Sequence, residues 1–280
     1  MKLVMTVAVV FILNFSAPIA EAQTTIPLTL FMGKIPAFHV RVNGHEGFFL
    51  FDTGGGTSVL SPDFARFSGC APWGQMTGFR MTGERLDMRR CDNVAFNVAG
   101  AHLKTPSAGV FDIMTMAPKT APHLDGSLGL DIFAGQVVTL DVSARTLTIE
   151  TAQSLRTRIR NAKEVPARLV RDAEGAALSV AAAVPTAKGL AWMELDSGND
   201  GSFEIANHVA PLFDLQPDRK EPQPISFMLG GLIPVKGTAL TSNLIMDGNI
   251  GEQFFPFWAV TFDLKAGRVW VASSLGPPGR

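Results

Sequence analysis

The sequence predicts an all-β protein built from two related lobes, and three observations support this fold class. Glycine and proline are abundant, with 27 and 18 copies in 280 residues, and 20 Phe occur without any Tyr, a composition that suits strands joined by turns. Short apolar runs end at turn signals. Two blocks from the first half reappear in the second half in the same order, which indicates a pseudo-two-fold axis between the halves.

Composition excludes several classes of protein. With 46% hydrophobic and 18% charged residues, the chain can bury a core, so it is not disordered, collagen-like or a coiled coil as a whole. The 24 Lys and Arg residues balance 25 Asp and Glu residues, giving a net charge of -1. Because no broad basic field is present, nucleic acid is not expected as a partner.

Residues 1–22 have the pattern of an export signal. Lys2 gives a positive start, residues 3–13 are apolar, and Ala-Glu-Ala at 20–22 is a small-x-small cleavage site. A membrane anchor is the weaker alternative, because the apolar run is shorter than the roughly 20 residues that cross a bilayer. We expect an exported protein, periplasmic or secreted, that meets the membrane only through a transient signal peptide.

Cys70 and Cys91 are the two cysteines. An even count in an exported chain favours one disulfide, and a pair of buried free thiols is the alternative. Their spacing fits neither a CxxC redox motif nor a four-ligand zinc site. We expect no metal and no cofactor.

The first repeated block surrounds an aspartate at the end of an apolar strand. Residues 47–65 read GFFLFDTGGGTSVLSPDFA, and residues 189–210 read GLAWMELDSGNDGSFEIANHVA. When Asp52 is aligned with Asp196, the Gly two residues on and the Ser six residues on both match. The repeat therefore pairs these two aspartates as equivalent positions.

The second repeated block begins at Asp125 in the first half and at Asp247 in the second. DGSLGLDIFAGQVVTLDVSARTLTI is echoed by DGNIGEQFFPFWAVTFDLKAGRVWV. The residues in register include the pairs Gly126/Gly248, Gly129/Gly251, Phe133/Phe255, Val138/Val260 and Thr139/Thr261. Two blocks in the same order predict two lobes of about a hundred residues each.

These blocks define the expected domains. The N-terminal lobe spans residues 24–150 and the C-terminal lobe spans residues 166–275. Residues 151–165 contain four basic residues and one acidic residue, which is typical of a solvated connector with one or two helical turns. A basic binding arm is the less favoured alternative.

Strands and turns can be placed in order within each lobe. Residues 37–42 and 47–51 flank Asn43-Gly44, a type I′ hairpin signal. Ser61-Pro62-Asp63 is typical of a helix start. The C-terminal lobe offers the strands 177–184 and 190–195, and each lobe should also hold a second hairpin, beginning at 137–141 and at 260–263.

The first lobe carries an insertion. Its two motifs are separated by 73 residues against 51 in the second lobe, and residues 76–88, MTGFRMTGERLDM, are predicted to form a flap hairpin. An ordinary exposed hairpin is the alternative. Candidate substrate-binding residues are those at the flap tip: Phe79, Arg80, Met81, Thr82 and Gly83.

The repeated aspartates suggest acid-base chemistry. A pseudo-two-fold axis would make Asp52 and Asp196 face each other, and two carboxyl groups in hydrogen-bonding range hold one proton between them. Such a pair can take a proton from water while it donates one to a carbonyl oxygen. The hydroxyls of Thr53 and Ser197 would brace the two loops.

Gly54 and Gly198 complete the two loops, since glycine lets the backbone approach closely. FDTGGGTSVLS followed by DGSLGLDIF resembles the active-site loop and second signature of retropepsins, and the presence of both halves in one chain resembles pepsins. The resemblance covers nearly all of the mature chain. It implies an acid-protease fold, with Asp52 and Asp196 as the catalytic pair of an aspartic endopeptidase acting on peptides or proteins.

Asp200 lies four residues after Asp196, where retropepsins often carry an acid that contacts the substrate backbone; a structural role is slightly favoured here.

The chain has no GxSxG, SxxK, HExxH or GxxxxGK[ST] motif. Two alternatives to the peptidase stay open. One is an exported, catalytically inactive peptide-binding protein with a retained acid-protease fold, and the weaker one is a structural envelope protein.

Overall fold

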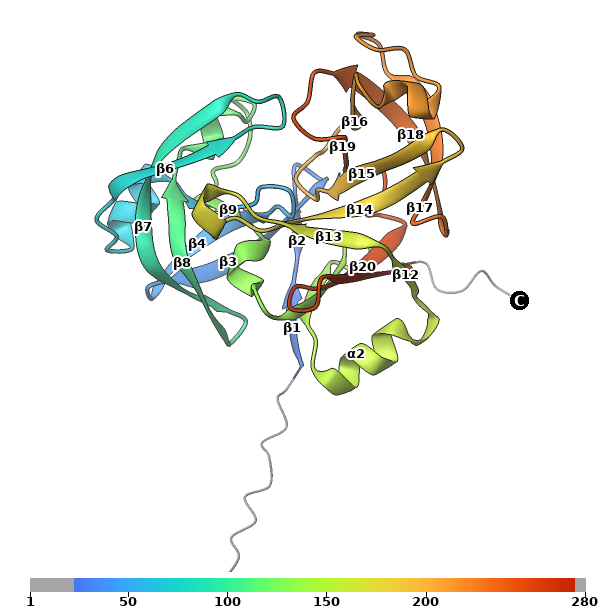
Figure 1. The fold of residues 1–280 in the computed structure, drawn as a ribbon. Coiled ribbons are helices and arrows are strands. Elements are labelled where there is room, and N and C mark those ends of the chain that lie inside the picture. Colours follow the sequence, from blue (N-terminus) through green and yellow to red (C-terminus); the bar gives the residue numbers. More distant parts are fainter. Residues whose placement is uncertain (1–22, 275–280) are drawn as a thin grey trace, which may run out of the picture.

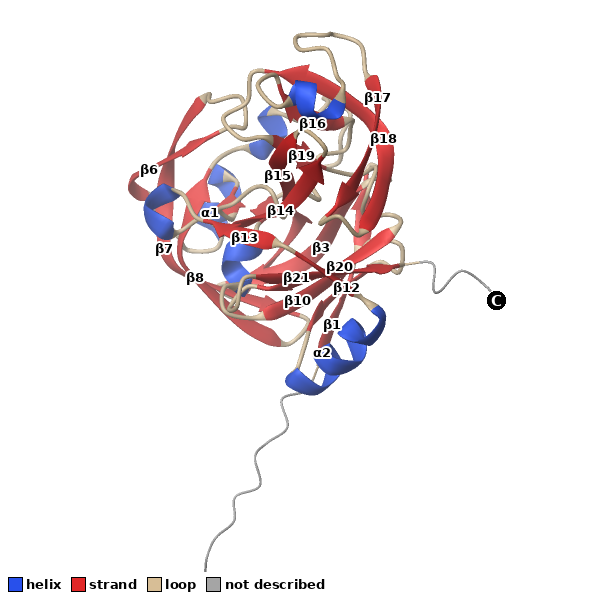
Figure 2. Ribbon diagram, turned by 45° about the vertical axis from the view of Figure 1, so that its right-hand side comes forward, coloured by secondary structure: helices blue, strands red, loops and turns tan. Residues whose placement is uncertain are grey.

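The computed structural model describes residues 23–274, so the predicted export signal lies outside the described residues. Two β-lobes flank a shared sheet (Figure 1), and the helices are few and short (Figure 2). The predicted all-β, two-lobed fold is confirmed. None of the helices within residues 23–274 is both long and apolar enough to span a membrane.

The N-terminal lobe is built on an eight-stranded sheet in the order β2-β3-β4-β9-β5-β8-β7-β6. The predicted hairpin is formed by β3 and β4, and Asn43 (φ 49°) and Gly44 (φ 88°) adopt the left-handed conformation that a type I′ turn requires. The strands are β2 (Thr29–Phe31), β3 (Ile35–Val42), β4 (His45–Phe51), β5 (Val59–Leu60), β6 (Trp73–Phe79), β7 (Arg85–Val98), β8 (Ala101–Val110) and β9 (Gly126–Leu128).

The C-terminal lobe repeats this topology in a seven-stranded sheet, β13-β14-β15-β19-β16-β18-β17. The parallel pair β15–β19 corresponds to β4–β9, as the two repeated blocks predict. The strands are β13 (Ala167–Val170), β14 (Ser179–Thr186), β15 (Gly189–Leu195), β16 (Phe203–Ala206), β17 (Gln223–Leu229), β18 (Ile233–Ser242) and β19 (Gly248–Ile250).

A six-stranded sheet, β1-β11-β10-β20-β21-β12, joins the lobes. In its centre β10 pairs with β20 so that Thr139 lies opposite Thr261, and their hydroxyl oxygens are 2.9 Å apart. The repeat equates these two residues, so the pseudo-two-fold axis passes between them. The strands are β1 (Thr24–Pro27), β10 (Val137–Asp141), β11 (Thr146–Ile149), β12 (Lys163–Val165), β20 (Trp258–Asp263) and β21 (Arg268–Ser273).

The helices begin at capping residues. At α1 (Pro62–Phe67), Ser61 Oγ accepts a hydrogen bond from the Phe64 amide at 3.1 Å, as the Ser-Pro-Asp signal predicts. At α2 (Ala152–Arg158), Thr151 and Ser154 form a capping box. Short 3-10 turns occur at Ile113–Thr115, Leu130–Phe133, Ile159–Asn161, Ala173–Gly175 and Ala210–Phe213.

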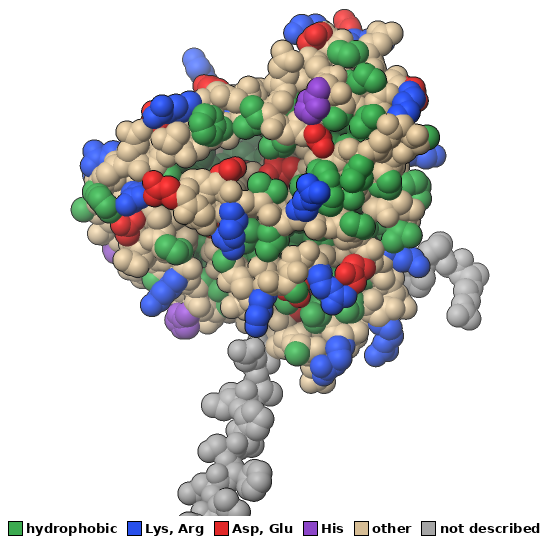
Figure 3. Space-filling view, in the orientation of Figure 1, with side chains coloured by type: hydrophobic (Ala, Val, Ile, Leu, Met, Phe, Trp, Pro, Cys, Tyr) green, Lys and Arg blue, Asp and Glu red, His purple; other side chains and the backbone are tan. Residues whose placement is uncertain are grey.

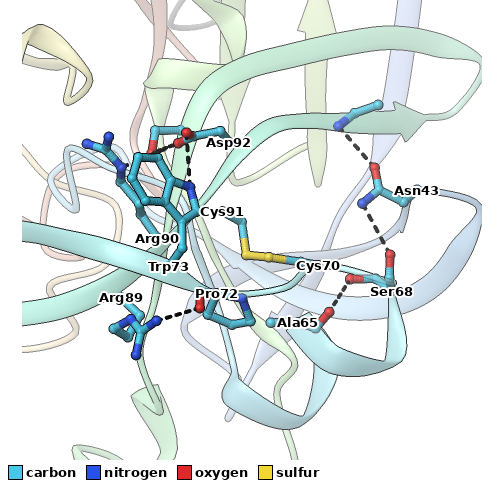
Figure 4. Close-up of a disulfide and its surroundings, with 12 residues drawn as sticks. Asn43, Ala65, Ser68, Cys70, Pro72, Trp73, Arg89, Arg90, Cys91 and Asp92 are labelled. Atoms are coloured by element: carbon cyan, nitrogen blue, oxygen red, sulfur yellow. Dashed lines mark hydrogen bonds and ion pairs between the residues drawn. A yellow bond between two sulfur atoms is a disulfide. The ribbon is translucent and has the colours of Figure 1, made fainter.

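The predicted disulfide between Cys70 and Cys91 is present (Figure 4). It joins the loop after α1 to β7, with the two Cα atoms 6.0 Å apart. Beside it the Arg90 guanidinium stacks on the Trp73 ring at 4.5 Å, and the Trp73 indole donates to Asp92 at 3.1 Å. These contacts anchor the base of the β6–β7 hairpin.

The β6–β7 hairpin is the predicted flap. Met76 pairs with Met88 and Phe79 with Arg85, and the hairpin reaches toward the C-terminal lobe in Figure 1. No strand of the seven-stranded sheet corresponds to β6. The β17–β18 hairpin folds back instead, because the Gly230 amide in its turn donates to the Ala183 carbonyl at 2.7 Å.

Candidate active site

A cleft of about 560 Å³ lies between the two lobes and beneath the flap. Figure 3 shows this hollow, with acidic and hydrophobic side chains at its edge. Both repeated loops line it through Asp52 and Asp196, as do the flap and residues 244–246 of the opposite lobe. The cleft therefore combines carboxyl groups with apolar walls.

Each candidate aspartate sits where a buried strand ends. Asp52 follows β4 and its amide donates to the Leu128 carbonyl at 3.0 Å, while Asp196 follows β15 and its amide donates to the Ile250 carbonyl at 2.9 Å. The two acceptors belong to equivalent strands, β9 and β19. The same local contact thus fixes both loops.

Thr53 and Ser197 connect the two loops by reciprocal hydrogen bonds. The Ser197 amide donates to Thr53 Oγ1 at 2.9 Å, and the Thr53 amide donates to Ser197 Oγ at 3.1 Å. Each hydroxyl then donates to the carbonyl that precedes the opposite aspartate, at Leu195 (2.6 Å) and Phe51 (2.8 Å). All four bonds are buried, so the aspartates are held in register.

The backbone of each loop also supports its own carboxyl group. Asp52 Oδ1 accepts from the amides of Gly54 (3.0 Å) and Gly55 (2.8 Å), and Asp196 Oδ1 accepts from the Gly198 amide at 2.7 Å. Gly54 lies against the Asp196 carboxyl and Gly198 against that of Asp52; a Cβ atom at Gly198 would be 2.5 Å from Asp52 Cγ. Glycine is therefore required at both positions.

The two carboxyl groups interact directly. Burial, followed by the charge of Asp196 and a hydrogen bond with it, raises the pKa of Asp52 well above its usual range. A pair of this kind, in which Asp196 is buried and Asp52 is half-buried, holds a proton that a solvated pair would lose. The arrangement can supply one acid and one base at a single point in the cleft.

Comparisons with known proteins agree with this geometry. The aspartyl protease family matches residues 38–132, which contain Asp52 and the flap. Similar solved structures include basic 7S globulin from soybean and conglutin gamma, a unique basic 7S globulin from lupine seeds, with TM-scores of 0.57 and 0.56. Each is 9% identical to this chain, and the alignment covers 90% of this chain and 95% of the other.

The chain has an acid-protease-like fold. The sequence comparison carries this for the N-terminal lobe, and the structural comparison extends the fold to both lobes. At 9% identity the globulins show the fold alone. No curated protein matches the sequence significantly.

Within this acid-protease fold, sequence reasoning missed Asn249. This fully buried side chain donates from Nδ2 to Asp196 Oδ2 at 2.6 Å and accepts on Oδ1 from Asn199 Nδ2 at 2.8 Å. The signal was present in the second block, where Asn249 in the C-terminal lobe replaces Ser127 in the N-terminal lobe.

Glu194 was missed as well. It lies two residues before Asp196 on the same face of β15, lines the cleft, and corresponds to Leu50 in the other lobe. Burial, and next the charge of Asp196, raise the pKa of Glu194 to about 8. A third carboxyl group, neutral at neutral pH, therefore adjoins the pair. A charged residue in the alternating pattern of a buried strand was its only signal.

The flap tip closes over the cleft. Phe79, Arg80, Met81 and Thr82 line it, and the Met81 carbonyl accepts a hydrogen bond from the Ile245 amide of the opposite lobe at 2.9 Å. The remaining predicted tip residue, Gly83, lies outside the lining; it has φ +84° and lies against Ile245. The cleft is thus covered from one lobe to the other.

Asp200 does not reach the cleft. Asp200 is exposed just before a bend at residues 201–202. Its carbonyl accepts a hydrogen bond from Lys34 Nζ at 2.9 Å, and its carboxylate makes no hydrogen bond to residues 23–274. The bend is set instead by Asn199, whose Oδ1 accepts from the Gly201 amide at 3.0 Å. This turn leaves the Asp200 side chain in solvent.

Within residues 23–274, no group of three His, Cys, Asp or Glu side chains has the arrangement of a metal site.

Proposed function

We propose that the protein is an exported aspartic endopeptidase that hydrolyses peptide bonds with the Asp52–Asp196 pair. One observation carries the proposal. Two carboxyl groups from equivalent loops interact at the centre of a cleft, with their backbones locked together by the Thr53–Ser197 exchange. Few structural requirements other than catalysis favour two carboxyl groups in contact and largely shielded from solvent, because their mutual repulsion costs stability.

The chemistry follows from the shared proton. The ionised carboxylate takes a proton from a water molecule whose oxygen attacks the peptide carbonyl carbon, while the protonated carboxyl donates to the carbonyl oxygen. The resulting tetrahedral species loses its amine after the nitrogen is protonated, and the C–N bond breaks. Neither aspartate forms a bond to carbon, so no covalent intermediate is required.

The substrate is proposed to be an extended peptide. A peptide can pair its backbone with the flap in the manner of an added strand, and the apolar residues Phe79, Met116, Val170 and Ile245 at the cleft favour apolar side chains near the cleaved bond. The disulfide is compatible with export to an oxidising compartment.

The test is digestion of a mixed peptide library by the mature protein from acidic to neutral pH, alongside Asp52→Asn. Cleavage by the parent and none by the variant supports the peptidase. The similarity in fold to two seed globulins favours one competitor, a catalytically silent peptide-binding protein. That competitor predicts peptide capture without cleavage by either protein.

A further inference from the structure

The two lobes differ at one pair of equivalent positions beside the aspartates. Ser127 is the middle residue of β9 and Asn249 is the middle residue of β19. Both lie between two neighbouring strands, and Asn249 pairs with Glu194 on one side and Glu204 on the other. The backbone is therefore alike in the two lobes, but only the C-terminal lobe presents an amide to its aspartate.

The orientation of the Asn249 amide is fixed by a chain of contacts that starts at the backbone. The Gly201 amide donates to Asn199 Oδ1, so Asn199 Nδ2 must point the other way, and it donates to both the Ser202 carbonyl and Asn249 Oδ1. Asn249 Nδ2 is thereby turned toward Asp196 Oδ2. Because an amide nitrogen can only donate, it favours an acceptor with no proton.

The donors are distributed differently over the two carboxyl groups. Both backbone donors to Asp52 reach Oδ1, and Oδ2 accepts no hydrogen bond from an N–H donor within residues 23–274. Asp196 accepts on both oxygens, from the Gly198 amide and from Asn249. Asp52 thus has an oxygen free to carry a proton, whereas a proton on either oxygen of Asp196 would oppose a donor.

We propose that Asn249 is a positioning residue that makes Asp196 the ionised member of the pair and leaves the shared proton on Asp52 Oδ2. This assignment deepens the proposed function and rests on it. Asp196 then takes the proton of the attacking water, and Asp52 donates its proton to the carbonyl oxygen. The lobes, although related, take unequal roles.

The other charges around Asn249 are compatible with this assignment. The titratable groups that face it or its partners are Asp52, Asp172, Glu194, Asp196 and Glu204. Asn249 Nδ2 also donates to Glu194 Oε2 at 3.3 Å, but the raised pKa of Glu194, about 8, keeps that group neutral where the pair works. Arg80, the cation in the described lining of the cleft, is on the flap and lies 3.6 Å from Glu84.

The first test is Asn249→Ser, which installs the residue of the equivalent N-terminal position and withdraws the donor. We expect the acidic limb of the kcat/KM profile on one cleaved peptide to move up by about one pH unit, the size expected for loss of a hydrogen bond to a charged group. A purely structural role would lower kcat/KM equally at every pH. An acidic limb that stays in place overturns the proposal.

Two further variants keep the test decisive. Asn199→Ala leaves Asn249 intact but frees its amide to rotate, so the acidic limb of the kcat/KM profile should move in the same direction by a smaller amount. If Asn249→Ser does not fold, Asn199→Ala alone provides the test. Ser127→Ala is the matched control in the other lobe, and it should not move the acidic limb, whatever it does to the rate. If Ser127→Ala moved the acidic limb as far as Asn249→Ser does, the assignment would be contradicted.

Carboxyl ¹³C NMR titration separates this proposal from the proposed function. Signals of the parent are assigned by comparison with Asp52→Asn. As pH rises, the first ionisation of the pair should appear at the Asp196 carbon and should move to higher pH in Asn249→Ser. If the parent cleaves no peptide, the peptidase proposal fails, while the titration still decides the role of Asn249. A first ionisation at the Asp52 carbon overturns it.

Discussion

Gly198 tests how closely the two aspartates approach. A Cβ atom at this position would lie 2.5 Å from Asp52 Cγ, so Gly198→Ala must push the two loops apart. Because a displacement of about 1 Å in a catalytic group can cost a hundredfold in rate, we expect kcat/KM to fall by at least about that factor with little change in KM. Steady-state kinetics on one cleaved peptide measures this.

The matched control is in the same loop. A Cβ atom on Gly201 would meet nothing closer than Asn199 Oδ1 at 3.7 Å, an ordinary contact. Gly201→Ala should therefore keep most of the activity. Equal losses in the two variants would show that the loop tolerates no side chain anywhere, and would remove the argument for cross-packed carboxyl groups.

The protonation of the pair predicts a bell-shaped dependence of kcat/KM on pH. Activity requires one proton, so it is lost in acid as the pair takes up a second and lost at higher pH as Asp52 releases its own. Since burial and the charge of Asp196 raise the pKa of Asp52, activity should extend from mildly acidic pH toward neutrality. A flat profile with full rate at alkaline pH would mean that another group performs the catalysis.

Among the elements, the flap depends on the Cys70–Cys91 bridge at its base. The bridge joins residues 21 apart, and closing a loop of that length stabilises the folded chain by about 3 kcal/mol in the chain-entropy treatment. Cys70→Ala/Cys91→Ala should lose about that much in denaturant unfolding. Reducing the disulfide of the parent should lower its free energy of unfolding by the same amount, whereas the reductant should not change that of the variant. If neither the substitutions nor reduction changed the free energy of unfolding, the bridge would not stabilise the protein.

Local sequence patterns allowed several elements to be predicted. The strands expected at 37–42 and 47–51 are β3 and β4, and the flap expected at 76–88 is formed by β6 and the start of β7. These elements were accessible because each follows from local periodicity and turn residues. The connector at 151–165 differs in part from the expectation, because its last three residues form β12 and pair with β21.

The parts that could not be predicted depend on strands brought together from distant segments. Asn249 acts on Asp196 because β19 lies beside β15, although 53 residues separate them. In the same part of the sheet, Glu194 is partly buried beside Asp196, and both effects raise its pKa. Asp200 shows the converse: its spacing from Asp196 suggested a role, but the Asn199 turn directs it to solvent. Spacing along the chain fixes neither burial nor partner.

The stability of the whole molecule should depend on a buried acid that does not line the cleft. Asp131 is 3% exposed and accepts from Ser58 Oγ at 2.6 Å and Thr105 Oγ1 at 3.2 Å, yet burial raises its pKa to about 6. The folded state therefore holds this proton more tightly than the unfolded state. The protonation of Asp131 therefore adds about 3 kcal/mol to the free energy of unfolding. This contribution is fully present below about pH 4 and is lost as pH rises through 6.

Asp131→Asn removes this dependence, because an amide cannot ionise. The free energy of unfolding of the parent minus that of the variant should fall by about 3 kcal/mol between pH 4 and pH 7. Denaturant titrations of both proteins at several pH values provide the measurement. The C-terminal lobe already has an amide, Gln253, at the equivalent position. A difference that is constant with pH would contradict the prediction.

The pairing of β10 with β20 about the Thr139–Thr261 axis has a consequence for half of the chain. A separated N-terminal lobe would leave β10 as an edge strand with unpaired amides and carbonyls, which is a template for self-association. A second copy of the same lobe offers an equivalent strand in the same register, with Thr139 opposite Thr139. Residues 23–150 alone should therefore form a symmetric dimer in sedimentation equilibrium, and the substitution Thr139→Lys should keep them monomeric.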